Sequence, residues 1–194
     1  MGRKKPTQYL EEEHASMARL RPARNFYLLL ENVRSMQNVG AIFRTADAFS
    51  AKGLILCGIT GRPPHREIYR TALGAEQSVP WEYFPSAQEA LRAYMAKGAI
   101  PVALEQTFSS INLALWPQQS RKAYPLAQHF VLVLGNEVEG VSESTLSLCQ
   151  HCLEIPQFGQ KHSLNVAVAA GIAMWEFARS CPEDSLEAPE TLVC

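Results

Sequence analysis

The stretch IPQFGQKHSLNVAVAAGIAMWEFA, residues 155–178, changes character halfway along its length. Its first half is crowded with hydrogen-bonding side chains. Its second half is a run of alanine, valine, isoleucine and methionine that is typical of a buried helix. Ser163 is placed to cap this helix by accepting a backbone N–H. Capping accounts neither for Asn165, expected in the first helical turn, nor for the polar loop before it, so these residues point to a function.

Upstream of this stretch, short apolar runs alternate with helical patterns. The runs that suit buried strands are 25–31, 53–59, 79–84, 99–105, 130–135 and 152–156. Helical spacing follows the first run, and residues 86–98 form an amphipathic pattern that ends at Gly98. Continuous apolar strands alternating with helices predict an α/β fold, in which helices cover both faces of a parallel sheet.

The length and composition are those of one ordinary domain. The 194 residues allow a sizeable core, and 47% hydrophobic with 19% charged residues is a common globular composition. We expect a partly helical N-terminal extension over 1–24, a single domain over 25–180 and a mobile C-terminal tail over 181–194. No apolar run reaches the length of a membrane span, and the start lacks the apolar segment of a signal peptide. A cytoplasmic location without membrane contact is therefore expected.

Net charge and cysteine usage narrow the classes of site. A formal net charge of −1 argues against a strongly basic nucleic-acid binder, although basic residues cluster between residues 3 and 24. The five cysteines include a C-x-x-C pair, Cys149 and Cys152, but no second ligand pair at zinc-binding spacing. We therefore expect small buried thiols and no metal site.

A second polar segment, residues 31–49, follows the first predicted strand. Asn38 stands where a helix is expected to begin and suits an N-cap. Gly40 is unfavourable inside a helix unless something approaches it closely. Arg44, taken alone, is most simply a surface arginine. None of the three decides a function by itself.

A third segment, residues 131–142, joins a buried strand to a glycine-containing turn. The strand ends at Gly135, and Asn136, Glu137 and Gly140 follow. Ligands in open α/β sheets bind beyond the carboxyl ends of strands, and glycines let a backbone approach a ligand closely. The segment matches neither the dinucleotide-binding fingerprint nor the P-loop, so the pattern alone does not separate a ligand site from a turn.

Together the three segments are similar to the signature motifs of the SpoU (TrmH) branch of the SPOUT RNA methyltransferases. The first motif, N-x-G-x-x-x-R-T, is matched by Asn38, Gly40, Arg44 and Thr45. The second, G-x-E-x-x-G-[VL] after an apolar strand, is matched by Gly135, Glu137, Gly140 and Val141. The third, I-P-x-x-G-x-x-x-S-L-N-V-x-x-A, is matched by Ile155, Pro156, Gly159, Ser163, Leu164, Asn165, Val166 and Ala169. Order and spacing agree over about residues 25–179.

The resemblance implies a fold and a cofactor. Family members have an α/β sheet whose C-terminal segment forms a deep trefoil knot, and the knot holds S-adenosylmethionine (SAM) in a bent form. By resemblance, the cofactor-binding residues of this chain are Leu104, Glu105, Leu134, Gly135, Gly140, Ile155, Pro156 and Leu164. Residues 157–163 are then a knot loop over the cofactor, and Ser163 and Asn165 face the reaction.

The resemblance also implies a reaction, the transfer of a methyl group from SAM to a ribose 2′-oxygen of tRNA or rRNA. An alcohol is a poor nucleophile until its proton is removed or polarised. The family gives this task to the arginine that matches Arg44. Because free arginine has a pKa above about 12, we interpret Arg44 as bridging a phosphate and the hydroxyl rather than as a base. The residues expected to assist it are Asn38, Glu137, Ser163 and Asn165.

Two alternatives stay open. One is a SPOUT enzyme that methylates a base nitrogen; such relatives typically need a carboxylate base and lack the first motif. The other is a non-catalytic RNA-binding relative, which would have lost Arg44 or Asn165. The resemblance further implies RNA as a partner, no metal, and a homodimer that pairs through the knotted region and the first helix. The motive for a dimer in the sequence is an apolar face expected on the last helix, formed by Val166, Ala170, Ile172, Met174 and Trp175.

Overall fold

The computed structural model describes residues 4–6, 9, 23–124 and 129–180. The chain divides into two compact units, one of them Arg24–Pro182 and the other made of Met1–Ala23 with Glu183–Cys194. Most of the predicted N-terminal extension, 1–24, and the predicted C-terminal tail, 181–194, lie outside the described residues. The sheet and the helices described below belong to the unit Arg24–Pro182.

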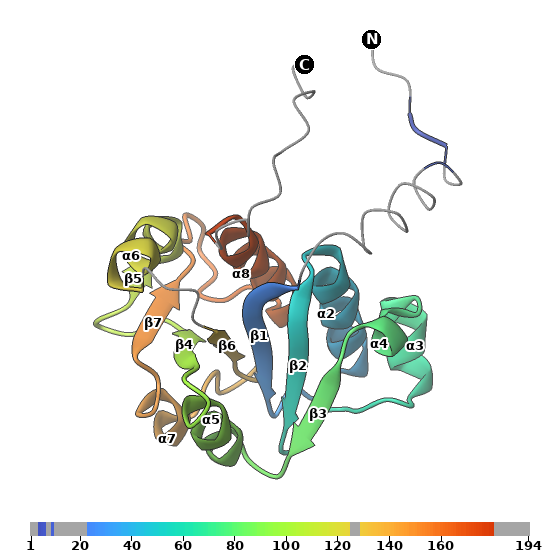
Figure 1. The fold of residues 1–194 in the computed structure, drawn as a ribbon, viewed down its shortest axis with the longest axis horizontal. Helices are drawn as coiled ribbons and strands as arrows, with labels where there is room; N and C mark the ends of the chain where they lie inside the picture. The colour runs from blue at the N-terminus through green and yellow to red at the C-terminus, as the bar shows by residue number, and fades with distance from the viewer. Residues whose placement is uncertain (1–3, 7–8, 10–22, 125–128, 181–194) are drawn as a thin grey trace. The chain divides into compact units, whose positions relative to one another are not determined.

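The described residues form a seven-stranded sheet of order β3-β2-β1-β6-β4-β7-β5 (Figure 1). Every pairing is parallel, so the predicted parallel sheet is confirmed. The strands are β1 Arg24–Glu31, β2 Ala51–Cys57, β3 Trp81–Phe84, β4 Ile100–Leu104, β5 Ile111–Asn112, β6 Phe130–Leu134 and β7 His151–Glu154. Six of them correspond to the predicted apolar runs, whereas the two-residue β5 was not predicted.

Helices lie on both faces of this sheet, as predicted. They are α2 Met36–Ala48, α3 Arg66–Ala72, α4 Ala75–Ser78, α5 Ala87–Met95, α6 Trp116–Ala123, α7 Glu143–Leu146 and α8 Val166–Ser180, with a 3₁₀ turn η1 at Leu113–Leu115. One core cluster contains buried residues of α2, α3, α4 and α8, and the other contains buried residues of α5. None of the described helices combines the length and the apolar character that a membrane crossing requires.

The continuous apolar strands are explained by these two layers. In β1, Leu28 and Leu30 belong to the first core cluster and Leu29 belongs to the second, and all three are fully buried. Successive side chains of a strand point to opposite faces, so a strand covered on both faces must be apolar at every position. An alternating polar pattern would instead have placed water against one face.

Helix α8 has one buried side and one exposed side. Val166, Ala170 and Met174 are buried in the core cluster that also contains α2 residues, whereas Ile172 and Trp175 are 40% and 56% exposed. The predicted single apolar face made of these five residues is therefore wrong, because the 3.6-residue period places them on two sides of the helix. The apolar residues on the exposed side are Val168, Ile172 and Trp175.

Candidate functional site

The loop that follows β6 forms a tight turn. Asn136 and Gly140 exchange backbone hydrogen bonds of 3.2 and 3.1 Å. The Asn136 side-chain oxygen also accepts from the backbone N–H groups of Val138 and Glu139, both at 2.9 Å. Gly140 has a φ of +68°, a left-handed conformation that favours glycine. The turn therefore has one well-defined shape.

Two carboxylates from the strands on either side of β6 hold the end of this turn. From the end of β4, Glu105 Oε2 accepts from Val141 N at 2.9 Å. From the end of β1, Glu31 accepts from Ser142 N at 3.0 Å, from Ser142 Oγ at 2.7 Å and from Thr145 Oγ1 at 2.7 Å. Glu31 is only 4% exposed, and a buried carboxylate needs such donors. We call Glu31, Glu105 and the residues they hold the carboxylate clamp.

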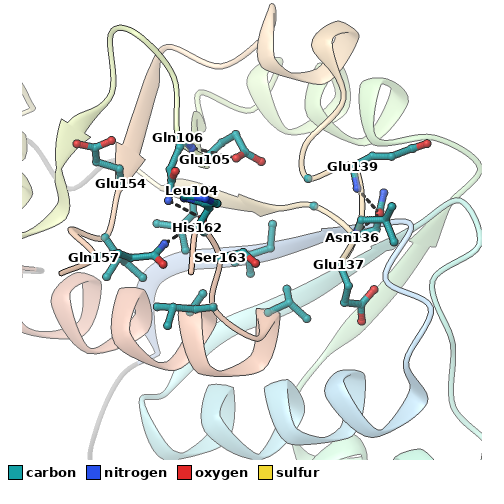
Figure 2. A pocket seen from close by; sticks show the side chains of 18 of the residues that line it. Leu104, Glu105, Gln106, Asn136, Glu137, Glu139, Glu154, Gln157, His162 and Ser163 are labelled. Atoms are coloured by element: carbon teal, nitrogen blue, oxygen red, sulfur yellow. Dashed lines mark hydrogen bonds between the residues drawn. The ribbon is translucent and has the colours of Figure 1, made fainter. Parts of the chain in front are cut away.

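The clamp shapes one wall of a pocket of about 300 Å³ at the carboxyl end of the sheet (Figure 2). Seven of the eight predicted cofactor-binding residues line it: Leu104, Glu105, Leu134, Gly135, Gly140, Ile155 and Leu164. Pro156 is exposed and lies outside the lining, although its neighbours Ile155 and Gln157 belong to it. Four carboxylates also border the pocket, those of Glu105, Glu137, Glu139 and Glu154.

The opposite wall of the pocket is the loop between β7 and α8. Its residues from Phe158 to Asn165 are exposed. Two side-chain amides, Gln106 Nε2 and Gln157 Nε2, donate to the carbonyl oxygen of His162 at 3.1 and 3.3 Å (Figure 2). Ser163, the next residue, lines the pocket. These two hydrogen bonds to the His162 carbonyl are therefore the main contacts that hold this wall.

A row of three side chains connects the two walls. Asn165 Nδ2 donates to Asn38 Oδ1 at 3.1 Å, and Asn38 Nδ2 donates to Glu137 Oε1 at 2.8 Å. Asn165 Oδ1 in turn accepts from Ala167 N at 2.9 Å and Val168 N at 3.3 Å. The N-terminus of α8 and the Glu137 carboxylate therefore fix the orientation of the Asn165 and Asn38 side-chain amides. One residue from each of the three sequence motifs meets in this row, which we call the Asn38 network.

The capping roles predicted for this region are wrong. Ser35, not Asn38, caps α2 by accepting from Asn38 N, so the Asn38 side chain is free to join the network. Asn165, not Ser163, caps α8, which begins at Val166. Serine and asparagine are about equally good N-caps, so the pattern could not place the cap within three residues.

The charge of Glu137 suits its place in the network. Partial burial raises the pKa of this carboxyl. Hydrogen bonds from the Asn38 amide and from the backbone N–H groups of Glu137, Arg34 and Ser35 lower it by more, so the pKa lies below its ordinary value. Glu137 is therefore ionised at neutral pH and acts as an acceptor.

Arg44 lies apart from this network. It is exposed on α2, and no hydrogen bond or ion pair joins it to another of the described residues. The nearby glycine of the same motif, Gly40, has a structural reason: a Cβ there would overlap Ile68 and Thr71 of α3. The group that approaches Gly40 closely, as the sequence predicts, is therefore helix α3.

The described residues contain no group of three or more His, Cys, Asp or Glu side chains that could hold a metal ion. Cys149 and Cys152 are free thiols. Burial, with smaller contributions from Cys152 and Glu31, raises the pKa of Cys149 to about 12. A thiol with such a pKa is a poor nucleophile and metal ligand at neutral pH.

Comparisons with known proteins agree with the motifs. The model of the SpoU rRNA Methylase family matches residues 25–175. The chain is 28% identical over 181 residues to the 23S rRNA (guanosine-2′-O-)-methyltransferase RlmB of Vibrio cholerae, covering 92% of this chain and 69% of that protein. It is 32% identical over 157 residues to an uncharacterized tRNA/rRNA methyltransferase of Synechocystis sp., covering 78% of this chain and 37% of that protein.

A solved structure extends the likeness to the fold. The SpoU methyltransferase AviRb from Streptomyces viridochromogenes in complex with the cofactor AdoMet is 27% identical, with a TM-score of 0.68, over 84% of this chain and 60% of that one. The chain thus spans less than two thirds of the length of both the Synechocystis relative and AviRb.

Proposed function

Because the chain belongs to the SpoU rRNA methylase family, we propose that it transfers a methyl group from SAM to the 2′-hydroxyl of a ribose in tRNA or rRNA. The observation that carries the proposal is the Asn38 network, in which side chains from all three motifs meet beside one pocket. Since these RNAs are found in the cytoplasm, a cytoplasmic location is part of the same proposal.

The pocket described above fits SAM. SAM carries positive charge on its sulfonium and amino groups, and the carboxylates of Glu105, Glu137, Glu139 and Glu154 border the pocket. Gly135 and Gly140 allow the turn that lines the pocket to close tightly, because an added Cβ would overlap the backbone of Gly140 and Val141 in the first case and the Glu105 carboxylate in the second. When bound, SAM supplies an activated methyl group. The clamp residues Glu31 and Glu105 would hold the wall against which it lies.

In the proposed mechanism the chain positions the ribose and polarises its hydroxyl. Arg44 would bridge the hydroxyl and a neighbouring phosphate through its planar fork of N–H donors. Asn38, Ser163 and Asn165 would orient the sugar, and Glu137 would keep Asn38 in place through its 2.8 Å hydrogen bond. Methyl transfer requires in-line approach, so fixing these groups carries much of the rate.

We also propose a homodimer and a C-terminal trefoil knot, both implied by the family resemblance. The exposed apolar side of α8, formed by Val168, Ile172 and Trp175, supports a dimer because it is large for a free surface. Arg44 supports a dimer as well, because it is exposed and forms no hydrogen bond or ion pair with the described residues of its own chain, so that a second chain can pack beside it. A monomer at micromolar concentration with full activity would contradict the dimer.

The experiment for the proposed function replaces Arg44 by alanine and by lysine. Single-turnover methyl transfer with saturating SAM and RNA separates chemistry from binding. Both variants should lose the reaction rate by orders of magnitude while retaining fold and SAM affinity, because an ammonium cannot reproduce a planar fork. Arg92→Ala, on the exposed side of α5, is the matched control. A lysine variant with most of the wild-type rate would overturn the role of the fork.

Binding of SAM should not depend on a metal. Calorimetry with and without EDTA is expected to give the same affinity, because methyl transfer from a sulfonium requires no Lewis acid. Loss of SAM binding in EDTA would contradict this part of the proposal.

A further inference from the structure

A second hollow lies on the surface away from the cofactor pocket, beside α3, α4 and the edge strand β3. It has a volume of about 520 Å³, and its lining includes Pro64, His65, Arg66, Tyr69, Glu76 and Trp81. We call it the α3 groove. Tyr69 is 60% exposed and Trp81 is 37% exposed. Two aromatic rings that remain this accessible in one groove are available for stacking with a ligand.

The lining of the α3 groove includes both aromatic and basic side chains. Next to it, the guanidinium of Arg62, in the loop before α3, lies 4.0 Å from the ring centre of Tyr83 on β3, a cation–π contact. The Nδ1 atom of His65 accepts from Glu67 N at 3.3 Å, so the neutral ring carries its proton on Nε2 and can donate it outward. Arg66 adds an exposed guanidinium.

We propose that the α3 groove binds a nucleobase and its phosphate from the RNA that this chain methylates, a role that rests on the proposed function. A base would stack on Tyr69 and Trp81, and its phosphate would lie against Arg66 and His65. Base–aromatic stacking contributes about 1–3 kcal/mol per base, and every base has a face that can stack. The carboxylate of Glu76 in the groove lining favours the base, whose edge carries N–H donors, over a phosphate at that position.

The place of the groove in the fold supports RNA as its occupant. Helix α3 packs directly against the start of α2: Thr71 Oγ1 donates to Gln37 O at 3.1 Å, and Gly40 leaves room for the backbone of Ile68. Gln37 immediately precedes Asn38. Helices α2, α3 and α4 lie side by side in Figure 1. A strand whose target ribose lies at the Asn38 network can therefore continue over α3.

The test measures RNA affinity apart from SAM affinity. The probes are total tRNA, fragments of rRNA and a labelled 20-nucleotide single strand, measured by fluorescence anisotropy with the full chain. The double variant Tyr69→Ala/Trp81→Ala and the single variant Arg66→Glu should each lose at least tenfold in RNA affinity. Trp81→Phe, which keeps a ring, should retain most of it. Leu115→Ala, 50% exposed at the start of α6, is the control and should bind like wild type.

The outcomes separate this inference from the proposed function. If the groove variants fold, bind SAM as wild type does and bind every RNA probe unchanged, the inference is overturned even when wild type methylates RNA. In that case a protein partner is the alternative occupant. If wild type itself neither binds nor methylates any RNA, the proposed function falls, and the inference falls with it. Loss of RNA affinity in both groove variants, with rescue by Trp81→Phe, supports the inference.

Discussion

The two walls of the cofactor pocket are held in different ways. The wall that follows β6, residues 135–142, is fixed by buried or half-buried hydrogen bonds to Glu31 and Glu105, which stand at the ends of the two strands beside β6. The wall that precedes α8, residues 157–163, is exposed from Phe158 onward, and two glutamine amides hold it by donating to the His162 carbonyl.

This difference indicates a division of labour. A wall fixed by the sheet can present Glu137 and the turn backbone at constant positions whether or not a ligand is bound. A wall held by exposed amides has a low free-energy cost of opening, as expected of an element that closes over a ligand. The Asn38 network joins the fixed wall to the end of the loosely held one, so it is the place where loop movement would affect the reaction.

Among substitutions in the two walls, removing the Glu31 carboxylate should have the largest effect on stability. In Glu31→Ala the Ser142 amide and the Thr145 hydroxyl, both held by that carboxylate, lose their acceptor. Leaving such donors unpaired costs about 1–3 kcal/mol each, so the free energy of unfolding should fall by roughly 2–6 kcal/mol. Urea denaturation measures this change.

The matched control for this variant is Glu143→Ala, because Glu143 is exposed and lies one residue after Ser142. Its effect should stay within about 0.5 kcal/mol. Equal effects of the two substitutions would mean that the clamp does not hold the loop.

A smaller contrast is expected between two glycine substitutions, one in each wall. Gly140→Ala should cost about 1–3 kcal/mol, because Gly140 has a φ of +68° and an added Cβ would overlap the Glu105 carboxylate. Gly159→Ala should change stability by less than about 0.5 kcal/mol, because nothing lies within 4 Å of an added Cβ there. Thermal denaturation of both variants tests the contrast; a more damaging Gly159→Ala would reverse it.

Removing the amides that hold the second wall should have a weak effect on stability. In Gln106→Ala/Gln157→Ala the His162 carbonyl loses both donors, and an exposed hydrogen bond contributes at most about 1 kcal/mol. Hydrogen exchange should become faster within 157–163 and stay unchanged within 135–142. The Michaelis constant for SAM should rise more than the maximal rate falls. Faster exchange in both segments would show that the walls are coupled.

The smallest effect concerns pH. Because the pKa of Glu137 is lowered in the folded chain, its contribution to stability is present in full above the ordinary carboxyl pKa and is lost only as the pH falls through the lowered value. Between about pH 6 and pH 8 its titration should therefore change neither stability nor rate. Asn38→Ala removes one donor and should raise the Glu137 pKa, as carboxyl carbon NMR would detect. An unchanged pKa would contradict the hydrogen bond.

Much of this arrangement could be predicted from local patterns, and the reasons are physical. Buried strands such as β1 are apolar at every position because both faces are covered, so runs like Leu28–Leu30 are visible in the sequence. The three motifs are also visible, because a turn and two helix starts constrain residues within short spacings.

The remaining features depend on contacts between distant residues. Glu31 lies at the end of an apolar strand, and the nearby sequence does not indicate its hydrogen-bond partners, because Ser142 is 111 residues away. The reason for Gly40 lies in α3, and the charge of Glu137 is stabilised by α2. The caps were misplaced because Ser35 and Asn38, or Ser163 and Asn165, suit that role equally well from sequence. The motif residues are thus visible in the sequence, whereas the contacts that hold them in place are not.

The central claim is that the chain methylates ribose 2′-oxygens of RNA. Its most direct test incubates tRNA and rRNA from a strain lacking the gene with the protein and methyl-labelled SAM, then digests the RNA to nucleosides and separates them by chromatography. We predict label in 2′-O-methyl nucleosides with wild type and almost none with Asn38→Ala. Label on a base, or no label in either RNA pool with wild type, would contradict the claim.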